Sequence, residues 1–240
     1  TTFRPKKKVT IVDASSTLVP LFPKQSSDYA RTWFTNRAVD LRLGQRLKRW
    51  DETSCTMEDG TIVEADLVYV CFGQRANSTM VSALVSEKSA TLPLLDQRKY
   101  VRVNSFLRVK DTNIFSCGDI ASPPFGGEKQ ALQAEIQGLV AAQNIVRAEM
   151  GKALVKYPVD VAHSEVMPLV FVLSLGRYDG VIGFNWLCVP GPLAAVIKWV
   201  LEYTKVLDMQ NKPLGKLVWK TAEATTLFLS RTVLKTQTER

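Results

Sequence analysis

Apolar and polar positions along the first third of the chain predict strands alternating with a helix. The run VTIVD at residues 9–13 is typical of a parallel strand buried on both faces. Residues 27–47 carry apolar side chains at helical spacing, which predicts an amphipathic helix followed by a short strand. A hairpin is predicted at residues 54–63, and the apolar run ADLVYVCF at 65–72 predicts a second buried strand. This order is typical of a doubly wound α/β nucleotide-binding domain.

The rest of the chain predicts short strands, one long helix and a terminal hairpin. Residues 100–109 predict a pair of strands, and NIFSC at 113–117 predicts another. After a loop rich in Pro and Gly, residues 128–150 are rich in Ala, Gln, Leu and Glu without Pro, which favours a long helix. Residues 167–189 predict a hairpin, and residues 193–203 predict a helix.

Composition supports a packed protein with an anionic partner. The 240 residues are 46% hydrophobic and 22% charged, which argues against disorder. Thirty-one Lys and Arg against 23 Asp and Glu give a net charge of +8, which suits a phosphorylated cofactor, an acidic membrane surface or nucleic acid. No RNA-binding motif supports nucleic acid specifically. No apolar run reaches the ~18 residues that cross a bilayer.

The cysteines predict reduced thiols. Cys55, Cys71, Cys117 and Cys188 are widely separated and form no CxxC pair, as expected in a reducing compartment. With His163 as the single histidine, the chain cannot supply zinc ligands at the usual spacing, so no metal site is predicted.

Two strand ends carry candidate chemistry of low specificity. Asp13 ends the first predicted strand, where an acid can bind a ribose hydroxyl, although many strands end in a turn-forming Asp. Gly73 follows the strand at 65–72, where a missing side chain would let a dinucleotide approach the backbone. A plain turn at the strand end is the alternative for both residues.

The run NIFSCGDIA, followed by a glycine-rich loop and the long helix, is more specific. Asp119, just after a buried strand, can accept hydrogen bonds from ribityl or ribose hydroxyls. The helix would direct its N-terminal amides at an electron-rich ring or a phosphate. A turn residue without a ligand is the alternative for Asp119.

The order VTIVD, hairpin, ADLVYVCFG, NIFSCGDIA and long helix resembles the C-terminal part of two-dinucleotide flavoprotein reductases. The tail, with FVLSLGRYDGVIGF, YTKVLDM and VWKT, resembles the flavin-dependent quinone reductases related to apoptosis-inducing factor, and the ferroptosis-suppressor type most. The resemblance extends over residues 8–221. It implies an α/β fold with partial doubly wound (Rossmann-like) NAD(P)H and FAD domains and a C-terminal hairpin-plus-helix cap.

The resemblance also implies roles for residues around the CGD run. Gly118 and Asp119 would hold the ribityl–pyrophosphate region of FAD. Lys129, Gln130 and Ala131 would lie at the N-terminus of the long helix, beside the isoalloxazine ring.

Three further residues follow from the same resemblance. Asp13 and Gly73 would face NAD(P)H. Lys205 matches a catalytic Lys near the flavin and quinone, where it could stabilise negative charge on either; a solvated Lys at a helix end is the alternative. Residues 184–199 would form a quinone-facing or membrane-facing wall, or else ordinary domain core.

The implied organisation is an NAD(P)H-domain remnant at 1–98, the end of an FAD domain at 99–150, and a quinone-side cap at 151–240. The implied activity is that of an FAD-dependent NAD(P)H:quinone oxidoreductase. No G-x-G-x-x-G turn occurs in these residues, so we expect a missing N-terminal half or a partner chain to complete both cofactor sites.

A catalytically inactive reductase-fold subunit, acting as a scaffold in a larger complex, is the alternative function, and the basic charge is compatible with it. Asp13 slightly favours NADH, because its carboxylate would repel a 2′-phosphate. The family resemblance suggests a membrane-associated protein of mitochondria or cytoplasm, with peripheral membrane contact.

Overall fold

The chain forms two compact units. The computed structural model describes residues 7–71, 73, 75–81, 94–110, 112–126, 129–163 and 165–232. One unit combines Thr1–Cys71 with Leu169–Thr226, and the second contains Phe72–Pro168. Segments from the beginning and the end of the chain therefore share one unit. The cofactor assigned to each predicted domain remains a prediction.

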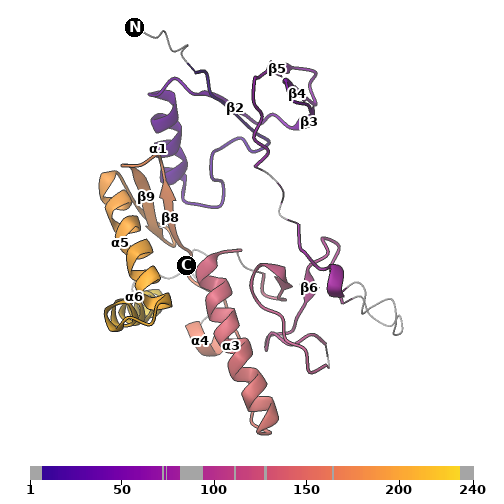
Figure 1. Cartoon of the computed structure of the whole chain (residues 1–240), viewed down its shortest axis with the longest axis vertical. Helices are drawn as coiled ribbons and strands as arrows, with labels where there is room; N and C mark the ends of the chain where they lie inside the picture. The colour runs from indigo at the N-terminus through magenta and orange to yellow at the C-terminus, as the bar shows by residue number, and fades with distance from the viewer. Residues whose placement is uncertain are drawn as a thin grey trace. The chain divides into compact units, whose positions relative to one another are not determined.

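The first unit begins with a strand–helix–strand motif (Figure 1). Strand β1 (Thr10–Asp13) pairs in parallel with β2 (Asp40–Leu43), and helix α1 (Lys24–Thr35) connects them. Apolar side chains of α1 join the core that holds Phe171 and Val181 of the C-terminal sheet. The predicted strand, amphipathic helix and short strand are confirmed, although the four residues of β1 are only partly buried.

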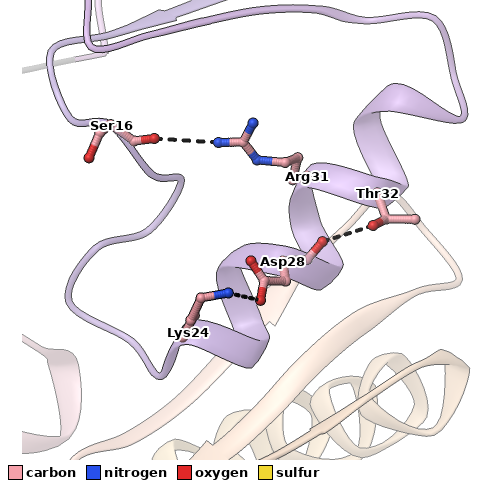
Figure 2. A network of polar contacts seen from close by, with 5 residues as sticks. All are labelled: Ser16, Lys24, Asp28, Arg31 and Thr32. Atoms are coloured by element: carbon pink, nitrogen blue, oxygen red, sulfur yellow. Dashed lines mark hydrogen bonds and ion pairs between the residues drawn. The ribbon is translucent and has the colours of Figure 1, made fainter.

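Polar contacts tie the loop after β1 to helix α1 (Figure 2). Arg31 donates to the carbonyl of Ser16 at 3.4 Å, which links the middle of the helix to the loop. Lys24 and Asp28 form an exposed i,i+4 ion pair at 2.5 Å, and the Thr32 hydroxyl donates to the Asp28 carbonyl at 3.0 Å. Such exposed contacts contribute little stability, so they orient the loop more than they stabilise the fold.

A small antiparallel sheet follows, in the order β3 (Leu47–Trp50), β4 (Ser54–Met57) and β5 (Ile62–Glu64). The predicted hairpin is β4–β5. Its turn contains Gly60 at φ +87°, a left-handed conformation that glycine adopts without strain. Strand β3 was not predicted.

The C-terminal part of the first unit is a sheet of β8 (Val170–Ser174), β9 (Gly180–Phe184) and β10 (Leu187–Pro190), in the order β10-β9-β8. Helix α5 (Pro192–Met209) packs against β8 and β9 (Figure 1). The predicted helix is confirmed. The hairpin predicted over residues 167–189 is confirmed for β8 and β9, but its second arm is not continuous, because a turn at Asn185, with φ +51°, separates β9 from β10. Helix α6 (Pro213–Thr232) was not predicted.

The second unit contains the long helix α3 (Ala131–Glu149), which is buried along one face only. Strand β6 (Val101–Arg102) pairs in parallel with β7 (Ala121–Ser122), and the 3-10 turn η1 (Gly118–Ile120) precedes β7. The short helix α4 (Val159–Ala162) follows α3. The buried core of the second unit includes Leu107, Val109, Val140 and Tyr157.

Three predicted strands are wrong. Residues 65–71 form no strand, and Leu67 and Tyr69 are 64% and 78% exposed. Residues 113–117 form no strand either, and neither do residues 107–109 of the predicted pair at 100–109. A single bridge joins Phe115 to Arg108. Residues 65–71 have no strand beside them in the described structure, and an apolar run without a hydrogen-bonded neighbour stays irregular. Residues 107–109 and 113–117 do pair, but only two backbone hydrogen bonds join them, from Val109 to Ile114 at 2.8 Å and from Ser116 to Leu107 at 3.0 Å, which is too few for a strand ladder.

Some predictions cannot be compared with the structure. Residue 72 of the predicted strand, Gly127 of the loop and residue 128 of the predicted helix lie outside the described residues. Helix α3 itself begins at Ala131. Among the described helices, none combines the length and apolar character that crossing a membrane requires.

Candidate functional site

The strongest candidate site is built where the CGD turn meets helix α3. Gly118 opens the turn with φ +72°, and its N–H donates to Oε1 of Gln137 at 2.8 Å. Asp119 follows on the exposed side of the turn. The turn packs against α3, so the sequence brings an exposed carboxylate beside the first turns of a long helix.

The surface between the turn and the helix is hollowed. Its walls come from the CGD turn, from the loop after β7 and from the N-terminal part of α3: Gly118, Asp119, Pro123, Gly126, Lys129, Gln130, Gln133, Ala134 and Gln137. The enclosed volume is only about 10 Å³, which is room for one water molecule. The hollow alone is far too small for a cofactor, so a cofactor site here would need further walls. The structure brings Gly118, Asp119, Lys129 and Gln130 together around this hollow.

Lys129 contributes a partly buried cation to this wall. Its Nζ donates to the carbonyl of Ala121 and lies 4.8 Å from the centre of the Tyr100 ring. Burial lowers the pKa of Lys129, while the nearby carboxylates of Asp119 and Asp96 act in the opposite direction. The side chain is thus held on the wall by a carbonyl and an aromatic ring.

The residues of this wall fit FAD. Oε1 of Gln130 is buried and has no hydrogen-bond partner among the described residues, so it can accept from a ligand donor. Ala131 is the first residue of α3, where backbone amides point out of the helix without intrahelical acceptors. With the Asp119 carboxylate, the wall offers acceptors for hydroxyl or ring N–H groups and donors for electron-rich atoms.

The two residues predicted to face NAD(P)H belong to different units of the chain. Asp13 ends β1 in the first unit, and its Oδ1 accepts from the backbone N–H of Ser15 at 2.7 Å. This is the turn contact that the alternative predicts for Asp13. Gly73 belongs to the second unit and has φ +79°, which explains glycine at that position. The structure does not test their role toward NAD(P)H.

Lys205 lies on α5 in the first unit and is 25% exposed. Its Nζ is 3.2 Å from Oδ2 of Asp208 and 4.3 Å from the centre of the Trp219 ring on α6. The side chain is therefore held between a carboxylate and an indole, in place of the free solvated Lys considered as the alternative. Its catalytic role remains a prediction.

Gln137, a residue of the wall, was missed from the sequence. Gln133 and Gln137 are buried on α3 and line the hollow. The available signal was their i,i+4 spacing beside Ala134 and Val140, which places two amides on the buried face of the helix. Amides on such a face need partners, and Gln137 finds one in Gly118.

The sequence matches a known family and curated proteins. Residues 2–144 match the family model described as pyridine nucleotide-disulphide oxidoreductase. The chain is 29% identical over 191 residues to ferroptosis suppressor protein 1 of Mus musculus, covering 74% of this chain and 46% of that protein. It is 30% identical over 141 residues to the Taeniopygia guttata protein of the same name, covering 59% and 34%. The chain thus spans about half the length of these relatives, or less.

Solved structures share the fold. The sulfide:quinone oxidoreductase of Aquifex aeolicus has a TM-score of 0.69 at 15% identity, over 94% of this chain and 54% of that chain. The NADH-bound, water-forming NADH oxidase of Lactobacillus brevis has a TM-score of 0.53 at 19% identity, over 74% and 37%. Proteins of this family use FAD and NAD(P)H. By its sequence match and its α/β fold, the chain belongs to the pyridine nucleotide-disulphide oxidoreductase family.

Proposed function

We propose that the chain is part of an FAD-dependent NAD(P)H:quinone oxidoreductase. The observation that carries this proposal is the wall formed by the CGD turn and α3, where the exposed Asp119 lies beside the unpartnered Oε1 of Gln130. The likeness to ferroptosis suppressor protein 1 and the fold shared with a sulfide:quinone oxidoreductase support it. Because the chain spans about half of its relatives, we propose that a further N-terminal region or a partner chain supplies the remaining walls.

On the FAD side, the residues of the wall bind and orient the cofactor. FAD supplies the redox chemistry when it is bound, because it accepts a hydride and returns electrons to a second substrate. The Asp119 carboxylate accepts hydrogen bonds from hydroxyl groups of the cofactor, and Gly118 keeps the turn compact. Lys129, Gln130 and the first amides of α3, at Ala131, face its electron-rich ring.

For NAD(P)H, we propose that Asp13 and Gly73 approach the nucleotide. Asp13 uses one carboxylate oxygen to hold the Ser15 amide, which fixes the side chain at the end of β1. A carboxylate fixed at a strand end can accept from ribose hydroxyls, and it disfavours a 2′-phosphate.

For the quinone, we propose that Lys205 stabilises negative charge that develops on the acceptor oxygen. Asp208 and Trp219 hold the ammonium group in place, at 3.2 Å and 4.3 Å. A positioned cation needs less reorganisation than a free surface Lys.

We also propose peripheral membrane contact through α5. Leu193, Val196, Trp199, Tyr203 and Val206 are exposed apolar residues at helical spacing, and Trp199 stacks on Tyr203 with ring centres 5.9 Å apart. An apolar helix face with aromatic residues, on a protein of net charge +8, suits an anionic lipid surface. Co-sedimentation with anionic vesicles should fall in Val196→Asp but not in Val146→Asp, an exposed site on α3. Equal sedimentation of the two variants would contradict the contact.

The experiment that tests the function is anaerobic visible spectroscopy of the full-length protein. We expect flavin absorbance that bleaches when NADH is added and returns when a quinone is added. Lys205→Met should leave the bleaching step largely intact and slow the return. Lys216→Met, at an exposed position on α6, is the control and should leave both steps unchanged.

The outcomes separate the alternatives. Bleaching without recovery by quinones would keep the flavin reductase but overturn the quinone as acceptor. A protein that purifies without flavin and does not bind added FAD would contradict the proposal and favour the scaffold function.

A further inference from the structure

Gln137 joins helix α3 to the CGD turn from inside the protein. Its side chain is 6% exposed, and its Oε1 accepts from the N–H of Gly118 at 2.8 Å. Both residues line the hollow described above. This contact joins residues 19 positions apart and fixes the residue directly before Asp119.

The Gly118 amide needs this acceptor because of its conformation. At φ +72°, Gly118 directs its N–H toward α3, and neither a helix nor a strand ladder supplies a partner at this position. A partly buried N–H that loses its acceptor costs considerable free energy, so the turn would rotate to find another partner. Asp119 follows in the same turn and would move with it.

A buried phenol lies near Gln137. The hydroxyl of Tyr157 is buried, and burial raises the pKa of this phenol to about 12, an effect that the neighbouring Gln137 moderates. The phenol is therefore neutral over the physiological range, and it places no charge near the bond between Gln137 and Gly118.

We propose that Gln137 is a positioning residue that holds the Gly118–Asp119 turn in the conformation that binds FAD. This inference rests on the proposed function, because it assigns a role toward the same cofactor. If only a fraction of molecules holds Asp119 correctly, the apparent dissociation constant for FAD rises by the inverse of that fraction. Loss of the Gln137 acceptor therefore weakens FAD binding even where the protein stays folded.

The test compares FAD affinity and thermal stability in variants of the full-length protein. Gln137→Met removes the acceptor at similar volume, and we expect FAD to bind about tenfold more weakly. Gln137→Glu keeps an acceptor oxygen in either protonation state, and we expect affinity within about twofold of the wild type. If Gln137→Met does not fold, Gln137→Asn, which is one methylene shorter, takes its place.

Asn144→Ala is the matched structural control. Asn144 is fully buried on the same helix but does not line the hollow. Asn144→Ala should lower the melting temperature and leave FAD affinity within about twofold of the wild type. A purely structural role for Gln137 predicts the same pattern for Gln137→Met.

Each outcome has one meaning. Weak FAD binding in Gln137→Met with recovery in Gln137→Glu supports the inference. Wild-type affinity in Gln137→Met, or no recovery in Gln137→Glu, overturns it and leaves the proposed function intact. A wild-type protein that does not bind FAD overturns the proposed function itself, and this inference with it.

Discussion

Two regions that were predicted to contact cofactors, the CGD turn and residues 65–71, differ in how much ordered structure the described chain forms there. At the CGD turn, the amide of Gly118 is bonded to Gln137, and apolar side chains pack around Tyr157. At residues 65–71, the apolar side chains of Leu67 and Tyr69 are exposed, and no strand forms. The first region is organised by a helix that follows it closely in sequence, whereas the second would need a neighbouring strand.

The largest difference should come from one substitution made in both regions. Leu107 is fully buried in the core of the second unit, and Leu67 is 64% exposed. Leu107→Ala should lower the free energy of unfolding by about 3 kcal/mol, because it leaves a cavity. Leu67→Ala should change it by less than about 0.5 kcal/mol. Urea denaturation of the chain measures both, and equal losses would refute the exposure of the second region.

Buried polar contacts should matter nearly as much. Asn144 donates to the carbonyls of Phe106 and Val155 and accepts from the Val155 amide, at 2.7–3.0 Å. Asn144→Ala leaves these groups without partners and should cost about 2–3 kcal/mol in urea denaturation. Gln143→Ala, at an exposed position of the same helix, is the control and should cost less than about 0.5 kcal/mol.

Alkaline pH should lower the stability of the second unit through Tyr157. Burial raises the pKa of its phenol from 10.0 to about 12. The folded state therefore keeps a proton that the unfolded state loses, so this stability is present below pH 10 and is lost as pH rises toward 12. The loss should reach about 2–3 kcal/mol at pH 12.

Tyr157→Phe should remove this part of the pH dependence. Lys129 is present in both proteins, so its own titration cancels in the comparison. Parallel stability curves for wild type and Tyr157→Phe between pH 9 and 12 would show that the phenol titrates normally.

The smallest difference concerns two glycines with left-handed backbones. Gly118 has φ +72° and is held by the Gln137 contact, whereas Gly73 has φ +79° and no atom within 4 Å of where a methyl group would lie. Gly118→Ala should cost about 1 kcal/mol, because the turn cannot relax. Gly73→Ala should cost less than about 0.5 kcal/mol, since no described strand holds its backbone. Thermal denaturation of the two variants ranks them, and the reverse order would contradict the comparison.

Local signals explain what the sequence predicted well. Helical spacing located α1, a composition of strong helix formers without Pro located α3, and the turn residues around Gly60 located the β4–β5 hairpin. The CGD run was placed correctly beside the start of α3, because both features are set by neighbouring residues. Residues 65–71 have an equally strong apolar pattern, but a strand also depends on a partner that the pattern does not specify.

The remaining errors have related causes. The packing of α1 against the C-terminal sheet joins distant segments, and local periodicity does not encode such pairings. Gln137 was missed because amides on a helix are common, and only the folded structure shows that one of them accepts from Gly118. Helix α6 was missed although its hydrophobic residues are spaced for one.

The measurement that tests the account most directly is FAD binding by the full-length protein. Flavin fluorescence reports the binding, and the wild type is compared with Asp119→Ala. We expect the wild type to bind FAD, and Asp119→Ala to bind it at least about tenfold more weakly, because a carboxylate hydrogen bond to the cofactor is lost. Asp66→Ala, in the segment at residues 65–71, should bind as the wild type does. Equal binding by Asp119→Ala and the wild type would contradict the assignment of the CGD turn as the FAD-binding wall.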